Sequence, residues 1–283
     1  MKKHKIALLV DSGCDLEAAF VKKHSIFTLP FVLMYDGEER LDGVMDPLEV
    51  YRRFPQEIPK TSTPSLQTVE DTVNQIIAEG YESIIAIDIS DQLSSTISTV
   101  SIVLGEHPEI PSFVLNSKNI STGSGLLAMW TAQKIAEGMS FEDLKKYLPE
   151  KIRDSKVFFY MDTLDYLKAG GRIGGVTAVV GSLLKIRPII TCDSNGRYET
   201  VAMIRGDKNA KKRLLELVSE YAGENPAWLG LMNGNALSES AEMKTILKKN
   251  LRKSKIVSEK QITASLAVHT GPGLLGVGVL RNP

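Results

Sequence analysis

In the first half of the chain, short apolar runs alternate with hydroxyl-rich loops and helical patterns. The runs at residues 5–11, 82–90 and 111–117 each end in Asp or Ser, and a segment of helical periodicity follows each of them. This alternation is typical of strands and helices that build a parallel sheet. Because open sheets of this kind bind ligands beyond the carboxyl ends of their strands, a site is expected in the loops that follow these runs.

The second half of the chain has a different pattern. Residues 157–163 are a further strand candidate, and residues 187–206 favour a β-hairpin because Asn195-Gly196 suits a two-residue type I′ turn. Residues 176–186 (VTAVVGSLLKI) are apolar on every side, which predicts a buried helix. A core helix and the wall of a ligand tunnel would both show this last pattern.

The change of pattern places a domain boundary near residue 155. Residues 1–155 are expected to form an α/β domain with a parallel sheet between layers of helices, and residues 156–283 a smaller α+β domain. A length of 283 residues fits two domains of ordinary size.

Charge and cysteine content exclude several classes of protein. Lys plus Arg and Asp plus Glu both total 34, so no net field attracts nucleic acid. Cys14 and Cys192 form neither a disulfide framework nor a metal set. The apolar run IALLV near the N-terminus has five residues, whereas a signal peptide needs about 7 to 15. We therefore expect a cytoplasmic protein that binds neither a metal nor nucleic acid.

Near the C-terminus, residues 271–276 (GPGLLG) match the Gly-x-Gly-x-x-Gly pattern of dinucleotide-binding loops. That loop opens a helix and needs an acidic residue about 20 positions later, but only seven residues follow Gly276. A nucleotide site is therefore rejected. Residues 262–269 (ITASLAVH) instead predict a buried strand that ends at His269, and the glycines after it let a ligand or another backbone approach closely.

Hydroxyl groups dominate the loops at residues 61–65 (TSTPS), 90–96 (SDQLSST) and 117–124 (SKNISTGS), which carry almost no positive charge. Hydroxyl and helix N–H groups can bind a carboxylate without a basic residue, whereas a polyphosphate usually recruits several Lys or Arg. A carboxylate is therefore the favoured ligand group. Helix capping alone would also explain each loop, because Ser and Thr are preferred N-cap residues.

Six motifs occur in order along the whole chain: KTSTPS, IAIDISDQLSST, STGSGLL, GGRI, LLKIRPII and HTGPGLLGVG. Together they resemble the DegV family of bacterial fatty-acid-binding proteins, some of which present a bound acyl chain to a separate fatty acid kinase. The resemblance implies a binding protein and not an enzyme, with a long-chain fatty acid as ligand, no cofactor, and the kinase as protein partner. It places the fatty acid between the two domains and leaves transient contact with a membrane open.

The resemblance also implies roles for individual residues. Thr61 matches the family's carboxylate-binding threonine, Ser94 its serine partner, and His269 the histidine that approaches the carboxylate, with Ser62 and Ser95 beside them. Further residues are expected to line the ligand: Gly123, Ser124, Gly171, Arg172, Ile173 and Gly271.

Two positions depart from the family pattern, because Ser95 stands where glycine is common and Asn116 where aspartate is common. Arg172 has glycines on both sides, at Gly170 and Gly171 and at residues 174–175. Because these glycines have no side chains, we expect the long side chain of Arg172 to project outward and to contact the kinase and not the fatty acid.

The same residues would suit an acyl hydrolase or transferase, with Ser94 as nucleophile and His269 as base. The sequence supports this enzyme poorly, because residues 123–125 (GSG) are not a Gly-x-Ser-x-Gly nucleophile elbow and no third member of a triad is evident. A P-loop kinase is excluded because the chain has no Gly-x-x-x-x-Gly-Lys-Ser/Thr motif.

Overall fold

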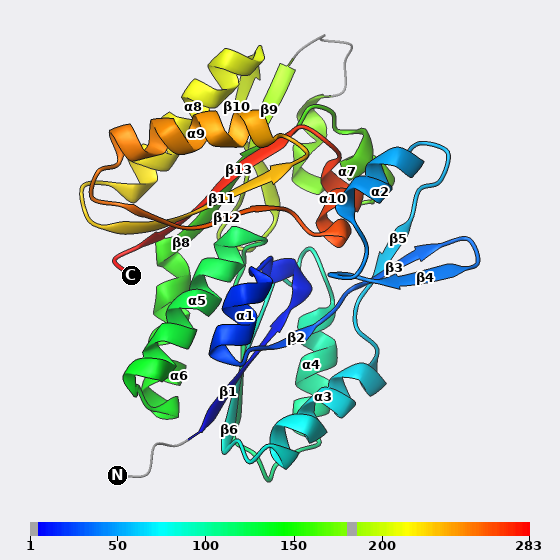
Figure 1. Ribbon diagram of the computed structural model, residues 1–283, viewed down its shortest axis with the longest axis vertical. Coiled ribbons are helices and arrows are strands. Elements are labelled where there is room, and N and C mark those ends of the chain that lie inside the picture. The colour runs from blue at the N-terminus through cyan, green and yellow to red at the C-terminus, as the bar shows by residue number, and fades with distance from the viewer. Residues whose placement is uncertain (1–4, 180–185) are drawn as a thin grey trace.

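A computed structural model describes residues 5–179 and 186–283, and its strands form three sheets (Figure 1). The first sheet is parallel and has the order β2-β1-β6-β7. Its strands are β1 (Ile6–Asp11), β2 (Phe27–Leu29), β6 (Ser83–Asp88) and β7 (Ser112–Asn116). Every residue of β1 and β6 is buried, which explains why these strands read as continuous apolar runs.

Helices cover both faces of the parallel sheet. Helices α3 (Leu66–Ala78) and α4 (Thr96–Gly105) pack on one face, and α5 (Thr122–Glu137) packs on the other. Residues 122–132 of α5 are all buried, because this helix also packs against the six-stranded sheet. A helix between two sheets has no solvent-facing side over this length, so its residues there are mostly apolar or small.

The six-stranded sheet has the order β10-β9-β8-β13-β11-β12, and all neighbours are antiparallel except β11 and β12. Its strands are β8 (Ser155–Tyr160), β9 (Ile186–Cys192), β10 (Tyr198–Arg205), β11 (Ala227–Gly234), β12 (Lys255–Gln261) and β13 (Leu274–Arg281). Helices α8 (Asp207–Ala222) and α9 (Leu237–Asn250) pack on its outer face, opposite α5. The α/β fold class predicted from the sequence is confirmed.

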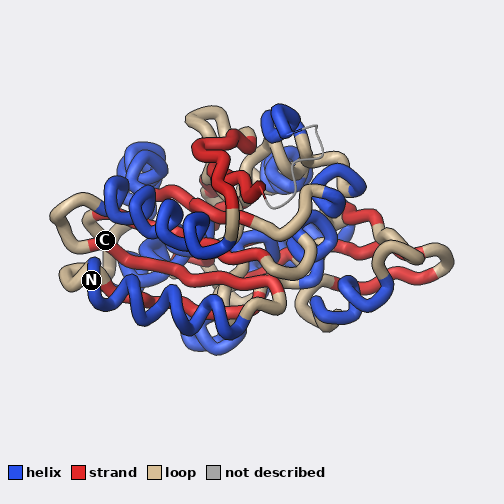
Figure 2. Tube along the Cα trace, turned by 90° about the horizontal axis from the view of Figure 1, so that it is seen from above, coloured by secondary structure: helices blue, strands red, loops and turns tan. Residues whose placement is uncertain are grey.

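The third sheet is a small antiparallel one, in the order β4-β3-β5. Its strands are β3 (Val32–Tyr35), β4 (Glu38–Leu41) and β5 (Lys60–Ser62), and α2 (Pro47–Arg53) lies between β4 and β5 in the chain. The β3–β4 hairpin turns at Asp36-Gly37 and projects from the body of the molecule (Figures 1 and 2). Thr61 and Ser62 thus lie on β5 of this sheet, and not in a loop at the end of a parallel strand.

Short helices and α6 complete the chain. They are η1 (Ser12–Cys14), α1 (Ala18–His24), α6 (Phe141–Lys151), η2 (Ile152–Asp154), α7 (Asp165–Ala169), η3 (Gly174–Val179) and α10 (Ala264–Thr270). Helix α10 packs against α2 and α7, and so lies between the small sheet and the C-terminal half of the chain.

The strand predicted for residues 262–269 is wrong, because this segment forms α10. The carboxylate of Asp42 accepts the backbone N–H (3.0 Å) and the hydroxyl (2.5 Å) of Ser265 in the first turn of this helix. The first turn of any helix leaves N–H groups without intrahelical partners. Here the cap comes from 223 positions away in the chain, so the local sequence does not show it.

The second half of the chain differs from the sequence-based prediction at two further places. The β9–β10 hairpin forms, but its loop spans residues 193–197, and Gly196 has a positive φ of 88° whereas Asn195 does not. A type I′ turn requires a positive φ at both of its central residues, so the predicted turn type is wrong. The helix predicted for residues 176–186 is replaced at its ends by η3 and β9, and residues 180–185 lie outside the described residues. The division into domains at residue 155 stays a prediction.

Two carboxyl groups are buried at the neighbouring ends of β1 and β6. Asp11 accepts the N–H groups of Cys14 (3.2 Å) and Ile89 (3.0 Å), whereas neither side-chain oxygen of Asp88 has a hydrogen-bond partner among the described residues. Burial raises the pKa of Asp11 to about 7, and burial together with the charge of Asp11 raises the pKa of Asp88 well above its ordinary value. Asp88 is therefore protonated at neutral pH, because an ionised carboxylate without partners is strongly unfavourable there.

We expect the free energy of unfolding to fall as the pH rises from about 4 to above about 7. Folding raises both carboxyl pKa values, so in this range the folded protein binds more protons than the unfolded chain. Asp88→Asn removes one of the two acids and should weaken this pH dependence. Urea unfolding near pH 5 and near pH 8 measures it, with the exposed Asp36→Asn as control. Equal pH dependence in wild type and Asp88→Asn would contradict the assignment.

Candidate functional site

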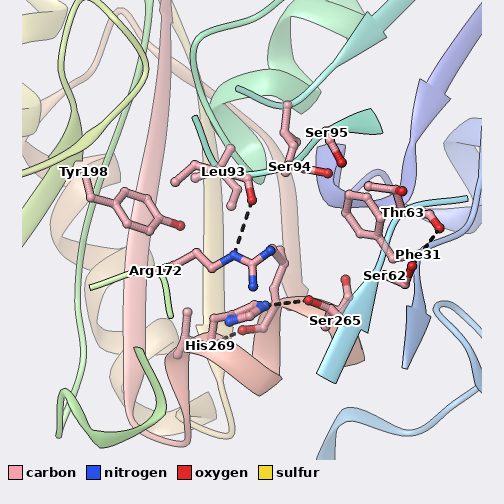
Figure 3. Close-up of a pocket in the computed structure, with 15 residues that line it drawn as sticks. Phe31, Ser62, Thr63, Leu93, Ser94, Ser95, Arg172, Tyr198, Ser265 and His269 are labelled. Carbon is pink, nitrogen blue, oxygen red and sulfur yellow. Dashed lines mark hydrogen bonds between the residues drawn. The ribbon is translucent and has the colours of Figure 1, made fainter. Parts of the chain in front are cut away.

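A cavity of about 210 Å³ lies where the parallel sheet, the small sheet, α10 and the segment after α7 meet (Figure 3). Its polar lining includes Thr61, Ser62, Ser94, Ser95, Arg172 and His269. Its apolar lining includes Phe31, Ile89, Leu93, Ile120 and Leu266. The structure thus brings together all five residues expected to bind a carboxylate, from segments far apart in the chain.

His269 and Thr61 meet across the cavity. Nε2 of His269, in the last turn of α10, lies 2.9 Å from Oγ1 of Thr61 on β5, and the two residues are 208 positions apart. Nδ1 of His269 has no hydrogen-bond partner among the described residues and faces Gly170, where an added Cβ would overlap it. Glycine at position 170 therefore makes room for the imidazole ring.

The imidazole of His269 is neutral. Burial, together with the nearby positive charge of Arg172, lowers the pKa of His269 to about 3. A neutral ring carries one hydrogen, and on Nδ1 this hydrogen would be a buried donor pointing at Gly170 without an acceptor. The hydrogen therefore lies on Nε2 and is donated to Thr61, whose own hydroxyl hydrogen stays available to another acceptor.

Ser94 lies in the loop between β6 and α4. Its Oγ accepts the backbone N–H of Thr96 (3.3 Å) and lies 2.9 Å from Oγ1 of Thr96. When the Thr96 hydroxyl donates this second bond, Ser94 also keeps its hydrogen for an acceptor in the cavity. Ser62 differs, because its hydroxyl donates to the carbonyl of Thr63 (3.3 Å).

Arg172 points into the cavity, and the sequence-based expectation that it projects outward is wrong. Its side chain lies between Leu93 and His269 (Figure 3). Nε donates to the carbonyl of Leu93 (3.4 Å), and one terminal nitrogen donates to the carbonyl of Gly170 (2.8 Å). The site therefore contains a cation, which the hydroxyl-rich loops did not indicate because Arg172 comes from a separate segment after α7.

A second cavity of about 20 Å³ lies beside the first. The two cavities share Ile120, Tyr198, Leu266 and Thr270. The smaller cavity is also lined by Ser121, Phe159, Met232, Ile262 and Leu274, so its wall is mainly apolar. The cavity that holds the hydroxyl groups and Arg172 thus adjoins a mainly apolar one.

Five of the residues expected to line a ligand do not reach these cavities. They are Gly123, Ser124, Gly171, Ile173 and Gly271. Gly123 and Ser124 lie in the first turn of α5, where Ser124 bonds to Ser117 (2.8 Å) and Gly123 packs against the side chain of Asn119. These two residues therefore serve the packing of α5.

The other three residues lie around the site without lining it. Gly171 lines an outer hollow beside Arg172, Ile173 packs against the main core, and Gly271 packs against the ring of Tyr166. Asn116, which departs from the family pattern, accepts the N–H of Lys118 (3.0 Å) and also lies outside the cavity.

Within residues 5–179 and 186–283, no group of three or more His, Cys, Asp or Glu is arranged to hold a metal ion. In the same part of the chain, no helix is long and apolar enough to cross a membrane.

Comparison with known proteins assigns the family. Residues 5–282 match the family model described as an uncharacterised protein of the DegV family. A DegV domain-containing protein of Clostridium acetobutylicum is 36% identical over 279 residues, which cover 98% of this chain and 99% of that protein. The chain belongs to the DegV family.

Solved DegV structures share the whole fold. A DegV protein from Thermus thermophilus, described by its fatty acid binding, has a TM-score of 0.89 at 26% identity and covers 98% of this chain and 99% of its own. A stearic-acid-binding protein from Eubacterium ventriosum has a TM-score of 0.89 at 28% identity over 98% of both chains. DegV from Bacillus subtilis, described as a fatty-acid-binding protein, has a TM-score of 0.87 at 26% identity, covering 98% and 99%.

We expect Gly170→Ala to destabilise this DegV protein, because the added methyl group would overlap the ring of His269. Gly170 has φ −75°, so its backbone tolerates alanine and the effect is steric. Overpacking typically costs about 1–3 kcal/mol. The cost should shrink in a His269→Ala background, and urea unfolding of the four proteins in this cycle measures the coupling. The same cost in both backgrounds would argue against the contact.

Proposed function

We propose that this DegV protein binds one long-chain fatty acid non-covalently, with the carboxylate at Thr61 and Ser94 beside His269. The observation that carries the proposal is a cavity of about 210 Å³ with hydroxyl groups and Arg172 among its apolar wall residues, next to a smaller and mainly apolar cavity. A fatty acid has the same division into a polar head and an apolar chain. The fatty-acid-binding descriptions of the DegV proteins from Thermus and Eubacterium support the same ligand class here.

The hydrogen bonds around the two hydroxyls suit a carboxylate, which only accepts hydrogen bonds. Thr61 accepts the Nε2–H of His269, and Ser94 accepts the backbone N–H of Thr96 and, in the orientation in which the Thr96 hydroxyl donates, that hydroxyl as well. Each hydroxyl therefore keeps one hydrogen to donate into the cavity. Two such donors can satisfy both oxygens of a carboxylate.

Arg172 supplies the complementary charge. Its guanidinium donates to the carbonyls of Leu93 and Gly170, and no carboxylate of the described residues pairs with it. A half-buried cation without a counterion is unfavourable, so an anionic ligand would stabilise this site. His269 cannot supply the charge, because its low pKa keeps it neutral.

The apolar part of the ligand would add most of the binding free energy. Burying each methylene contributes about 0.8 kcal/mol, so a long acyl chain needs only an apolar channel and one satisfied carboxylate. Leu266 and Ile120 line both cavities and would contact the chain along this path.

We expect Thr61→Ala and Ser94→Ala each to weaken fatty acid binding by roughly 10-fold to 150-fold. Hydrogen bonds to a charged group contribute about 1.5–3 kcal/mol, and each 1.4 kcal/mol is about tenfold in affinity. Ser62→Ala is the matched control with a small expected effect, because the Ser62 hydroxyl is engaged by Thr63. Calorimetric titration of lipid-free protein with palmitate measures all three. Unchanged affinity in Thr61→Ala and Ser94→Ala would remove both residues from the carboxylate site.

An acyl hydrolase or transferase that uses Ser94 and His269 is the alternative function. Nε2 of His269 contacts Thr61 and not Ser94, and no acid of the described residues orients Nδ1 as in a catalytic triad. A histidine with so low a pKa is also a weak base. Intact mass spectrometry after incubation with acyl substrates distinguishes the functions. Release of unmodified fatty acid supports binding, and a covalent acyl adduct on Ser94 supports the enzyme.

We further propose that the protein presents its fatty acid to a separate kinase for acyl phosphate formation. An outer hollow of about 580 Å³ lies beside the ligand cavity, and both are lined by Leu93, Arg172 and Tyr198. A partner that holds a phosphoryl donor could therefore approach the carboxylate from the surface past Arg172. This geometry is compatible with both roles expected for Arg172, as a ligand-lining residue and as a partner contact.

We expect Arg172→Gln to weaken fatty acid binding by about tenfold or more, because it removes a charge-assisted hydrogen bond. At saturating fatty acid it should also slow phosphorylation by a cognate fatty acid kinase. Arg197→Gln is the control for binding, because Arg197 lines the outer hollow and bonds to Gln92 (2.9 Å) without lining the ligand cavity. A loss of turnover that added fatty acid fully restores would remove Arg172 from the partner contact.

A further inference from the structure

Met232 of β11 lines the inner, smaller one of the two adjoining cavities described above, which together we call the ligand channel. The inner cavity of about 20 Å³ has room for about one water-sized group. Met232 lines it and is 2% exposed. An acyl chain that enters from the polar end and passes Leu266 therefore meets the Met232 side chain.

A glycine in the neighbouring strand gives this methionine its place. Gly276 of β13 pairs with Met232 on one side and with Phe159 on the other. A Cβ added to Gly276 would overlap the terminal methyl group of Met232 and would press on Cβ of Phe159. The Met232 side chain thus lies folded over Gly276, across the inner face of the sheet.

Polar groups also contact the thioether sulfur of Met232. Oγ of Ser121 lies 2.8 Å from Sδ of Met232 and donates to Asp15 (2.7 Å), which forms an ion pair with Lys260 (2.8 Å). Ser121 and Asp15 are both buried. Methionine usually adapts to gaps in a core, but these contacts hold Met232 in one position at the end of the channel.

We infer that Met232 sets the maximum acyl chain length that the protein accepts. The inference rests on the proposed fatty acid binding and adds its selectivity. Met232→Ala removes the thioether and terminal methyl group, and so opens space between the inner cavity and Thr122, whose Oγ1 lies 3.6 Å from Sδ. A longer chain would then extend along the path that Met232 occupies.

The test is the affinity of lipid-free protein for saturated fatty acids of increasing length. Affinity should rise about fourfold for each added methylene until the chain meets Met232, and should then stop rising. We call the chain length at which affinity stops rising the break. In Met232→Ala this break should move to acids longer by roughly two or three carbons. Met232→Val, which suits a strand better, should move the break in the same direction by less.

Met243→Ala is the matched control, because Met243 is equally buried but belongs to the cluster on the outer face of the six-stranded sheet. It should lower the free energy of unfolding and leave the break unchanged. An unchanged break in the folded Met232 variants, or an equal shift in Met243→Ala, would overturn the inference while leaving fatty acid binding intact. A wild-type protein that binds no acid of any length would instead overturn the proposed function.

Discussion

The two hydrogen bonds from Ser265 to the carboxylate of Asp42 determine where the candidate site lies. They satisfy the first turn of α10 and attach that helix to the loop after β4. From this attachment α10 carries Leu266 into the channel and brings His269 to Thr61 on β5. The polar end of the channel is thus assembled from the small sheet and the C-terminal part of the chain, and Asp42 provides one of the contacts that join them.

Among the described residues that line the site, neutral side chains surround one cation, which is Arg172. His269 is neutral because burial and Arg172 both disfavour its charged form, so it orders Thr61 by donating a hydrogen bond. Arg172 keeps its charge and has only carbonyl partners in the described structure. A singly charged carboxylate balances this site, whereas a polyphosphate would leave most of its charge uncompensated.

The buried acids of the parallel sheet connect to the same region. Asp11 accepts the N–H of Ile89, and Ile89 lines the ligand cavity at the start of the loop that carries Ser94. The raised pKa values of Asp11 and Asp88 mean that at least one proton is retained at the neighbouring ends of β1 and β6 near neutral pH. Asp11 therefore holds the start of the loop that carries Ser94.

The sequence by itself determined the strands β1, β6 and β7 and the helices that follow them, because apolar runs and helical periodicity are local signals. The family motifs also located Thr61, Ser94 and His269. Only the tertiary structure decided that residues 264–270 are helical, since their cap is Asp42. It also decided that Arg172 turns inward, because the carbonyls of Leu93 and Gly170 that hold it become neighbours only when the chain is folded.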